Sequence, residues 1–197
     1  MECLTQKILL MAFIDEHKAK FENLNYALHE SNSTQLKREA NGGNSILFTF
    51  PPIEEALYLA KAKELLNDDN KFTFIDISEL FVEYIDEDGI DEFLSLYQQL
   101  QPTPYKLFFS KEDPHTDLYD KIINRIVETV DSGKTPVLIK TGILYGTGIE
   151  NINITDNSTV MNLKLPLVIF YPGVMNGENH HFLNAKEASK YRCTVIK

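Results

Sequence analysis

Cysteine is scarce in this chain of 197 residues, which contains only Cys3 and Cys193. Two cysteines near opposite ends make neither a disulfide framework nor a Cys-x-x-Cys metal site. Without any sign of secretion, we expect reduced thiols and a cytoplasmic protein. Long apolar runs are also lacking. The run Ile8 to Ile14 is too short to cross a bilayer, which takes ~20 residues, and it lacks the flanks of a signal peptide, so no membrane association is expected.

Positive charge is also in short supply. The chain has 19 Lys and Arg against 29 Asp and Glu, which gives a formal net charge of −10. Affinity for a phosphate backbone comes mainly from clustered basic residues, so direct binding to nucleic acid is not expected. The deficit is greatest between Phe72 and Tyr105, where Lys and Arg are absent and the acidic residues are Asp76, Glu79, Glu83, Asp86, Glu87, Asp88, Asp91 and Glu92.

This acidic segment has two interpretations. It is either a solvated helical face or a surface that docks a basic partner or repels nucleic acid. Under the second interpretation the candidate partner-binding residues are Glu79, Glu83, Asp86 and Glu87.

Catalytic and metal-binding signatures are missing as well. The sequence has neither the G-x-S-x-G nor the H-E-x-x-H pattern. The segment from Asp113 to Asp117, which includes His115, is explained by a capped helix start as well as by a metal site. His180 and His181 point in different directions in regular structure, so a solvated loop explains them better than a metal site. We therefore expect no metal, no cofactor and no enzymatic activity.

The rest of the sequence predicts strands that alternate with helices. The apolar runs predict strands at Ser45–Phe50, Phe72–Ile77, Val137–Ile139, Leu165–Tyr171 and Arg192–Ile196. The alternation predicts the α/β class, with a mainly parallel, doubly wound sheet of about five strands, Rossmann-like or P-loop-like, and helices on both faces. We predict that residues 1–44 form an N-terminal helical segment and a linker (residues 31–44) packed on the α/β domain of residues 45–197.

Local signals predict where the helices begin and end. Pro51-Pro52 ends the first strand and starts a helix, and Ser78 is the predicted N-cap of the helix that follows the second strand. Asp113-Pro114 is predicted to start a helix whose apolar stripe is Leu118, Ile122, Ile126, Val127 and Val130. A weaker helix is expected over residues 149–163. Pro172-Gly173 is predicted to end the fourth strand, with a polar loop over residues 176–181.

The candidate site lies in the stretch from Thr135 to Asn151. The run Val137–Ile139, which we interpret as the central strand, leads into a loop with three glycines at the edge where α/β proteins bind ligands. The lysine of a phosphate-binding loop is missing, because Ile149 and Glu150 follow the last glycine. Three glycines can still let backbone N–H groups approach an anion, so the loop is either a structural turn or a phosphate site.

Five residues are the candidate ligand-binding set. Asp76, at the end of the second strand, is placed to bind a ribose hydroxyl or a metal, or else to help cap the following helix. The full set is Asp76, Thr141, Gly142, Tyr145 and Gly146.

Several short motifs, taken in order over about residues 20 to 197, resemble one family. They are Phe48-Thr-Phe-Pro-Pro-Ile-Glu-Glu55, Phe74-Ile-Asp-Ile-Ser-Glu-Leu80, the Thr141-Gly142 step leading to Tyr145, Leu165-Pro-Leu-Val-Ile-Phe-Tyr-Pro-Gly173, and Tyr191-Arg-Cys-Thr-Val195. The set resembles the BrxB family of BREX bacteriophage-exclusion systems. The chain departs from the family pattern at residues 146–148 and in the Asn- and Thr-rich segment that follows.

The resemblance implies a cytoplasmic bacterial defence component without an assigned catalytic activity. Such proteins act beside a PglZ-type protein of the alkaline phosphatase superfamily, a large ATPase and an adenine methyltransferase. The expectation is therefore a non-catalytic adaptor of a BREX complex that contacts the PglZ-type protein and other BREX components. The alternative, from the glycine loop, is a nucleotide- or phosphate-binding α/β domain.

Overall fold

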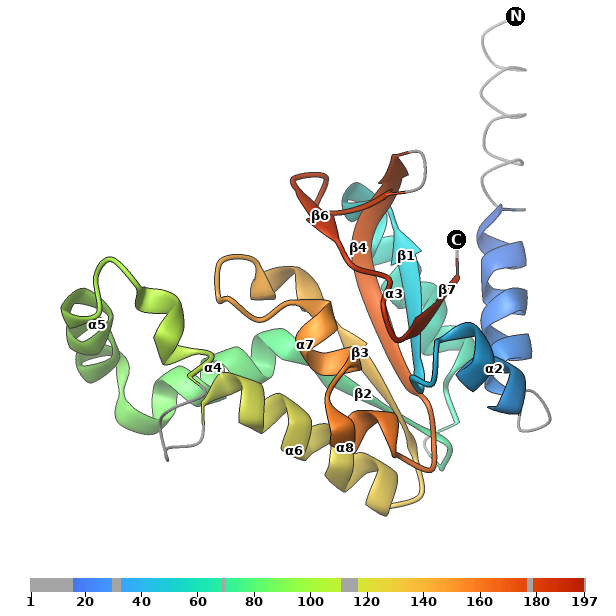
Figure 1. Ribbon diagram of the computed structural model, residues 1–197, viewed down its shortest axis with the longest axis horizontal. Coiled ribbons are helices and arrows are strands. Elements are labelled where there is room, and N and C mark those ends of the chain that lie inside the picture. The colour runs from blue at the N-terminus through green and yellow to red at the C-terminus, as the bar shows by residue number, and fades with distance from the viewer. Residues whose placement is uncertain (1–15, 30–32, 69, 111–116, 177–178, 197) are drawn as a thin grey trace, which may run out of the picture.

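The chain folds around a parallel five-stranded sheet (Figure 1). The computed structural model describes residues 16–29, 33–68, 70–110, 117–176 and 179–196. The strand order is β2-β3-β4-β1-β7, and each neighbouring pair is parallel. The strands are β1 (Ser45–Phe50), β2 (Phe72–Asp76), β3 (Thr135–Ile139), β4 (Leu167–Asn176) and β7 (Cys193–Ile196). The predicted α/β class, with a mainly parallel sheet of about five strands, is confirmed.

Helices follow or precede most of these strands. The α-helices are one over residues 16–28, then α2 (Ser33–Glu39), α3 (Glu55–Leu65), α4 (Ile77–Asp88), α5 (Ile90–Gln99), α6 (Leu118–Asp131), α7 (Asn151–Thr155) and α8 (Ser158–Met161). Three short 3-10 helices are η2 (Pro52–Glu54), η3 (Pro104–Leu107) and η4 (Thr141–Leu144). The single helix predicted over residues 149–163 is wrong, because it is divided into α7 and α8.

Two interior strands, β1 and β3, are buried along their whole length because both of their faces are covered. Every residue of β1 and of β3 is buried, as expected for parallel strands with helices on both sides. The central strand of the five is β4, and β3 lies between β4 and the edge strand β2. The prediction that Val137–Ile139 is the central strand is therefore wrong. Burial on both faces does not distinguish a central strand from its neighbour.

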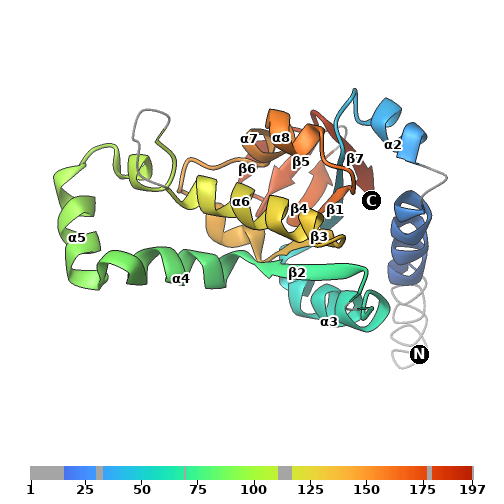
Figure 2. The same cartoon turned by 90° about the horizontal axis from the view of Figure 1, so that it is seen from below.

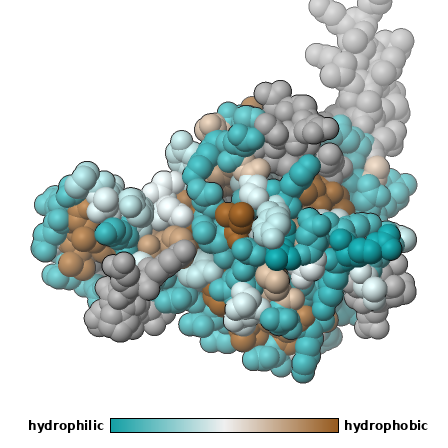
Figure 3. All heavy atoms as spheres, in the orientation of Figure 1, coloured by the Kyte–Doolittle hydropathy of each residue, from teal (hydrophilic) through white to brown (hydrophobic). Residues whose placement is uncertain are grey.

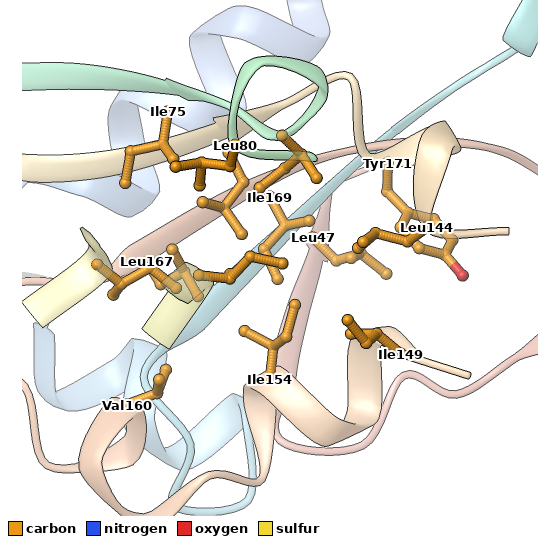
Figure 4. Close-up of a cluster of buried hydrophobic side chains, with 14 of the residues drawn as sticks. Leu47, Ile75, Leu80, Leu144, Ile149, Ile154, Val160, Leu167, Ile169 and Tyr171 are labelled. Carbon is orange, nitrogen blue, oxygen red and sulfur yellow. The ribbon is translucent and has the colours of Figure 1, made fainter. Parts of the chain in front are cut away.

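Two hydrophobic clusters occupy the two faces of the sheet. One contains Leu47, Leu138 and Ile169 with residues of α4, α6, α7 and α8, and Figure 4 shows part of it. The other contains Phe48 and Phe170 with residues of the 16–28 helix, α2 and α3. Alternate residues of β1 thus enter opposite clusters, which is the period-two geometry of a strand.

The second strand and the helix start that we predicted after it need correction. Strand β2 ends at Asp76, and Ile77 already belongs to α4. Asp76 is the N-cap of α4, because its carboxylate accepts a hydrogen bond from the backbone N–H of Ser78. The prediction that Ser78 is the cap is wrong. Its small polar side chain suits a cap, but it lies within the first turn.

The start of α6 lies four residues later than the sequence indicated. Asp117 caps this helix by accepting from the backbone N–H of Asp120 at 2.9 Å. Asp113-Pro114, the predicted start, lies outside the described residues. The predicted apolar stripe is largely confirmed, since its buried members are Leu118, Ile122, Ile126 and Val130.

Strand β4 runs past Pro172, so the predicted strand end at Pro172-Gly173 is wrong. The proline stands where parallel pairing with β1 stops, opposite Phe50, and antiparallel pairing with β5 (Asn179–Phe182) starts at Gly173. A Cβ on Gly173 would lie 2.5 Å from the carbonyl oxygen of His181, so glycine allows β5 to approach. Strand β5 pairs in turn with β6 (Lys186–Ala188). The prediction of a polar loop over residues 176–181 is wrong at residue 176 and at residues 179–181, which belong to strands, and residues 177–178 lie outside the described residues.

Residues 31–44, which we predicted as a linker, contain a helix that packs on the sheet. Leu36 of α2 is buried in the same cluster as Phe48. The side-chain amide of Asn44 donates to the carbonyl oxygens of Leu163 and Leu165, at 2.9 and 3.0 Å. These contacts join the N-terminal segment to the chain just before β4.

A helical arm leads away from the sheet. We define the arm as α4, α5 and η3, residues 77–107. Figures 1 and 2, which are turned by 90°, both show α5 at the end of α4 that is remote from the sheet. The first turn of α4 is anchored by the buried residues Ile77 and Leu80, whereas α5 has no buried residue. Among the described residues, none of the helices combines the length and the apolar character needed to cross a bilayer.

Candidate functional site

A charged corner forms where β2 and β3 end side by side. The Lys140 ammonium lies 2.7 Å from Asp76 Oδ2. The other carboxylate oxygen of Asp76 accepts from the backbone N–H and from the hydroxyl of Ser78, at 2.9 and 2.6 Å. Asp76 thus caps a helix and neutralises a lysine in the same place. The structure assigns its oxygens to these protein partners.

The same contacts set the protonation of this pair. Burial alone would raise the pKa of Asp76, but the hydrogen bonds from Lys140 and Ser78 outweigh it and hold that pKa below its ordinary value. The bond to Asp76 raises the pKa of Lys140, so the ammonium stays protonated and cannot serve as a base. Lys140 also adopts a φ of 54°, which is uncommon outside glycine.

Glu55 completes this corner from the first residue of α3. Its Oε1 atom is buried and has no hydrogen-bond partner among the described residues. Burial raises the pKa of Glu55, the nearby Lys140 lowers it, and Asp76 raises it further. With Glu55 ionised, two carboxylates face one ammonium, so the corner repels an additional anion.

The loop after β3 lines a pocket whose wall does not include the residues of this corner. The pocket has a volume of about 290 Å³ and lies between the loop, α7, β4 and the β5–β6 hairpin. Three residues predicted from the sequence meet there: Thr141, Tyr145 and Gly146. Gly142 instead faces the side chains of Leu183 and Pro172, and Asp76 lies in the charged corner. The structure therefore divides the predicted set among three environments.

Two of the loop glycines are required by backbone conformation. Gly146 and Gly148 have φ values of 89° and 79°, which residues with a Cβ rarely adopt. A Cβ on Gly148 would also come within 3.3 Å of the Tyr105 ring. The glycines therefore shape a turn that closes against η3. The Thr141 hydroxyl donates to the Phe170 carbonyl oxygen at 2.7 Å, which ties the loop to β4.

Most of the pocket wall comes from residues that the sequence did not single out. Tyr171 in the middle of β4 stacks on Phe182 of β5 with ring centroids 4.8 Å apart. Glu150 forms an ion pair with Lys186 across the mouth, and buried Asn151 begins α7. The sequence offered a signal for Tyr171, which is the last residue of the apolar run that predicted the fourth strand, because ligands bind beyond the carboxyl ends of such strands. Phe182 and Lys186 had no such signal, because they arrive through the hairpin.

Of the four acidic residues predicted to bind a partner, two form ion pairs within the protein and two do not. Glu87 forms an ion pair with Lys121 of α6, and Glu83 lies 3.5 Å from Arg125 of the same helix. Glu79 and Asp86 form no ion pair with any described residue, and both are exposed. Two of the four therefore fasten α4 to α6, and two remain available on the surface.

The weak metal patterns lead to no cluster in the described part of the chain, where no three His, Cys, Asp or Glu side chains are placed to hold an ion. Asp117 uses its oxygens on the backbone N–H groups of Ser110 and Asp120, and His181 belongs to β5. Comparison of the chain with protein-family models, with curated proteins and with solved structures gave no match.

Proposed function

We propose that this chain is a non-catalytic adaptor of a bacterial BREX phage-defence complex, and that its arm contacts a PglZ-type protein. The family part of the proposal is supported by the ordered sequence motifs described above. The contact part is supported by the surface of the arm.

The observation that carries the proposal is an apolar stripe on α5. Ile90, Leu94 and Tyr97 are 54%, 47% and 37% exposed, and their spacing places them on one face of the helix. Figure 3 shows apolar surface gathered at this end of the molecule among hydrophilic atoms. Burying such a side chain stabilises a protein by roughly 1.5–3 kcal/mol. A stripe left in water is therefore suited to a partner.

The charge around this stripe defines the kind of partner. Asp91 and Glu92 occupy the first turn of α5, and exposed Asp86, near the end of α4 that adjoins α5, forms no ion pair with any described residue. The segment from Phe72 to Tyr105 has no Lys or Arg. A partner surface with an apolar groove and a basic rim is complementary to it, and the charges would mainly accelerate association.

The test is affinity measured between the full-length chain and the PglZ-type protein of the same system. Leu94→Asp should weaken binding by at least about tenfold, since one buried charge costs more than ~1.4 kcal/mol. Leu57→Asp is the matched control, because Leu57 is 56% exposed on α3, away from the arm. Equal affinities for the two variants, or no association at micromolar concentration, would refute the proposal.

The second candidate is binding of a nucleotide or phosphate at the pocket. One observation favours it: Thr141, Tyr145 and Gly146 line a cavity at the carboxyl edge of the sheet. Thermal unfolding with ATP, GTP and NAD, with and without Mg²⁺, tests it. A ligand at 100 times its dissociation constant should stabilise the fold by about 2.7 kcal/mol, and no shift with any of them would remove this candidate.

A further inference from the structure

The pocket beneath the β5–β6 hairpin has an apolar floor. Leu144 of η4, Ile149 before α7, Ile154 of α7 and Ile169 of β4 line it, and all four are nearly inaccessible to solvent. Figure 4 shows Leu144, Ile149 and Tyr171 together at one end of the buried cluster. A volume of about 290 Å³ lies at the lower limit for small-molecule sites, so the occupant is small.

Aromatic rings form one side of the pocket. Tyr171 and Phe182 are both buried and stacked, and the Tyr145 ring lies 6.4 Å from that of Phe182. Tyr145 is 55% exposed, so it stands at the mouth. A flat ring entering the pocket would contact these aromatic surfaces, and aromatic pairs attract one another beyond the effect of the area they bury.

Two buried polar groups face one another beside these rings. The Tyr171 hydroxyl donates to Asn151 Oδ1 at 3.5 Å, which is a long hydrogen bond. The Asn151 amide nitrogen donates to the Ser189 carbonyl oxygen, and an amide has a second N–H. The Tyr171 oxygen also has acceptor capacity. A ligand N–H group can therefore donate to the Tyr171 oxygen, and a ligand acceptor can receive the second N–H of Asn151.

The charges at the mouth are negative in sum. Glu150 and Lys186 neutralise one another, whereas Glu187 lines the same pocket and has no cationic partner among the described residues. Burial raises the pKa of Tyr171, and Glu150 raises it further. These carboxylates favour a cation at the mouth and oppose an anion, so a cationic ligand and the nucleotide or phosphate of the second candidate function exclude one another.

We propose that this pocket binds a small aromatic amine, meaning one or two fused aromatic rings with a nearby protonated nitrogen. The ring would lie on the apolar floor against Tyr145 and Phe182. The ammonium would lie at the mouth near Glu187, where the Tyr145 face adds a cation–π contact. An aromatic ring with a nearby ammonium group occurs in a free aromatic amine and also in a peptide that has an aromatic residue beside a lysine.

Calorimetry on the full-length chain with three indole probes tests this assignment. Tryptamine is cationic, indole is neutral and indole-3-propionate is anionic. The expected affinity order is tryptamine, indole, indole-3-propionate, with at least tenfold between the first and the last. The peptide acetyl-Lys-Trp-Lys-amide, titrated alongside, shows whether a free amine or a protein segment is the better source. Similar affinity for the cationic and anionic probes, or no binding at millimolar concentration, overturns the proposal.

Variants locate the binding in this pocket. Tyr145→Ala, at an exposed position that does not endanger folding, should weaken tryptamine binding about fivefold. Glu187→Gln should reduce the preference for tryptamine over indole. Tyr26→Ala is the control, because Tyr26 is 62% exposed on the 16–28 helix. Unchanged tryptamine affinity in Tyr145→Ala overturns the assignment. The proposal is independent of the arm, since Leu94→Asp should leave tryptamine binding intact.

Discussion

Strand β1 and helix α5 are both rich in apolar residues, yet the fold uses them in opposite ways. All six residues of β1 are buried, whereas none of the ten residues of α5 is. The difference is position: β1 lies inside the sheet with helices on both faces, and α5 lies at the far end of the arm. Apolar residues in β1 are therefore committed to stability, while those of α5 remain available for a partner.

The arm is nevertheless an ordered part of the molecule. Phe93 of α5 packs near Tyr84 of α4 and near Phe108 beyond η3, with ring centroids 6.4 and 5.8 Å apart. The Tyr84 hydroxyl donates to the Leu107 carbonyl oxygen, and Lys121 and Arg125 of α6 pair with Glu87 and Glu83. The inner face of the arm thus holds its shape, and the outer face carries the exposed stripe.

The largest effect on stability is expected from a large-to-small substitution in the body, by which we mean the sheet and the helices packed on its two faces. Phe48 is fully buried between Phe21 and Phe170, with ring centroids 4.9 and 4.7 Å away. Phe48→Ala should destabilise the protein by about 3–5 kcal/mol, because it removes buried area and leaves a cavity. Urea denaturation followed by circular dichroism measures this. A loss below ~1 kcal/mol would show that the two sheet faces are not tightly packed.

A smaller effect is expected where the arm rejoins the body. Asp117 holds the backbone N–H groups of Asp120 and Ser110, so Asp117→Ala should cost about 1–2 kcal/mol. Asp88→Ala is the control, since an acidic residue at the C-terminal end of α4 gains nothing from the helix dipole. Equal unfolding midpoints for the two variants would mean that the cap contributes little.

The charged corner should show two opposite dependences on pH. Glu55 has a raised pKa in the folded state, so its cost to stability appears as pH rises above the ordinary value of 4.5 and through the folded pKa. Glu55→Gln should therefore raise the thermal midpoint at pH 7 and change it little at pH 4. The opposite result would mean that Glu55 has a favourable partner when ionised.

Asp76 behaves in the reverse way because its folded pKa is lowered. The ionised Asp76 stabilises the folded protein at pH values above 3.8, the ordinary pKa of an aspartate, and this stabilisation is lost as pH falls through the lower pKa of the folded state. Asp76→Asn should thus lower the thermal midpoint at pH 7 and much less at pH 3. A difference that does not change with pH would assign the effect to the helix cap alone.

The smallest effect on stability is expected on the outer face of the arm. Leu94→Ser should change the free energy of unfolding by no more than about 0.5 kcal/mol, as surface substitutions usually do. The same variant should lose affinity for the partner, which separates binding from folding. A loss of stability comparable to that of Asp117→Ala would instead show that the stripe packs against the body, and the contrast with β1 would fail.

Prediction from the sequence succeeded where the signal was local. The limits of β1 and the apolar stripe of α6 follow from uninterrupted or periodic apolar residues. The lining of the pocket followed from the sequence only in part, because Thr141 and Tyr145 lie in one continuous loop, whereas Phe182 and Lys186 come from a hairpin. That hairpin depends on β4 continuing through Pro172, and a proline normally indicates a strand end.

The chain by itself determined the parallel α/β class, the glycine turn after β3 and the absence of basic residues in the segment that becomes the arm. Each of these three features depends on residues that are consecutive in the sequence, because burial of a strand on both faces, a positive φ and the charge of a segment are all properties of the local sequence. Tertiary structure alone decided that Lys140 pairs with Asp76, that Tyr171 stacks on Phe182, and that the described residues leave no residue of α5 buried. Those outcomes depend on which strands become neighbours, and pairings between distant segments leave no local pattern.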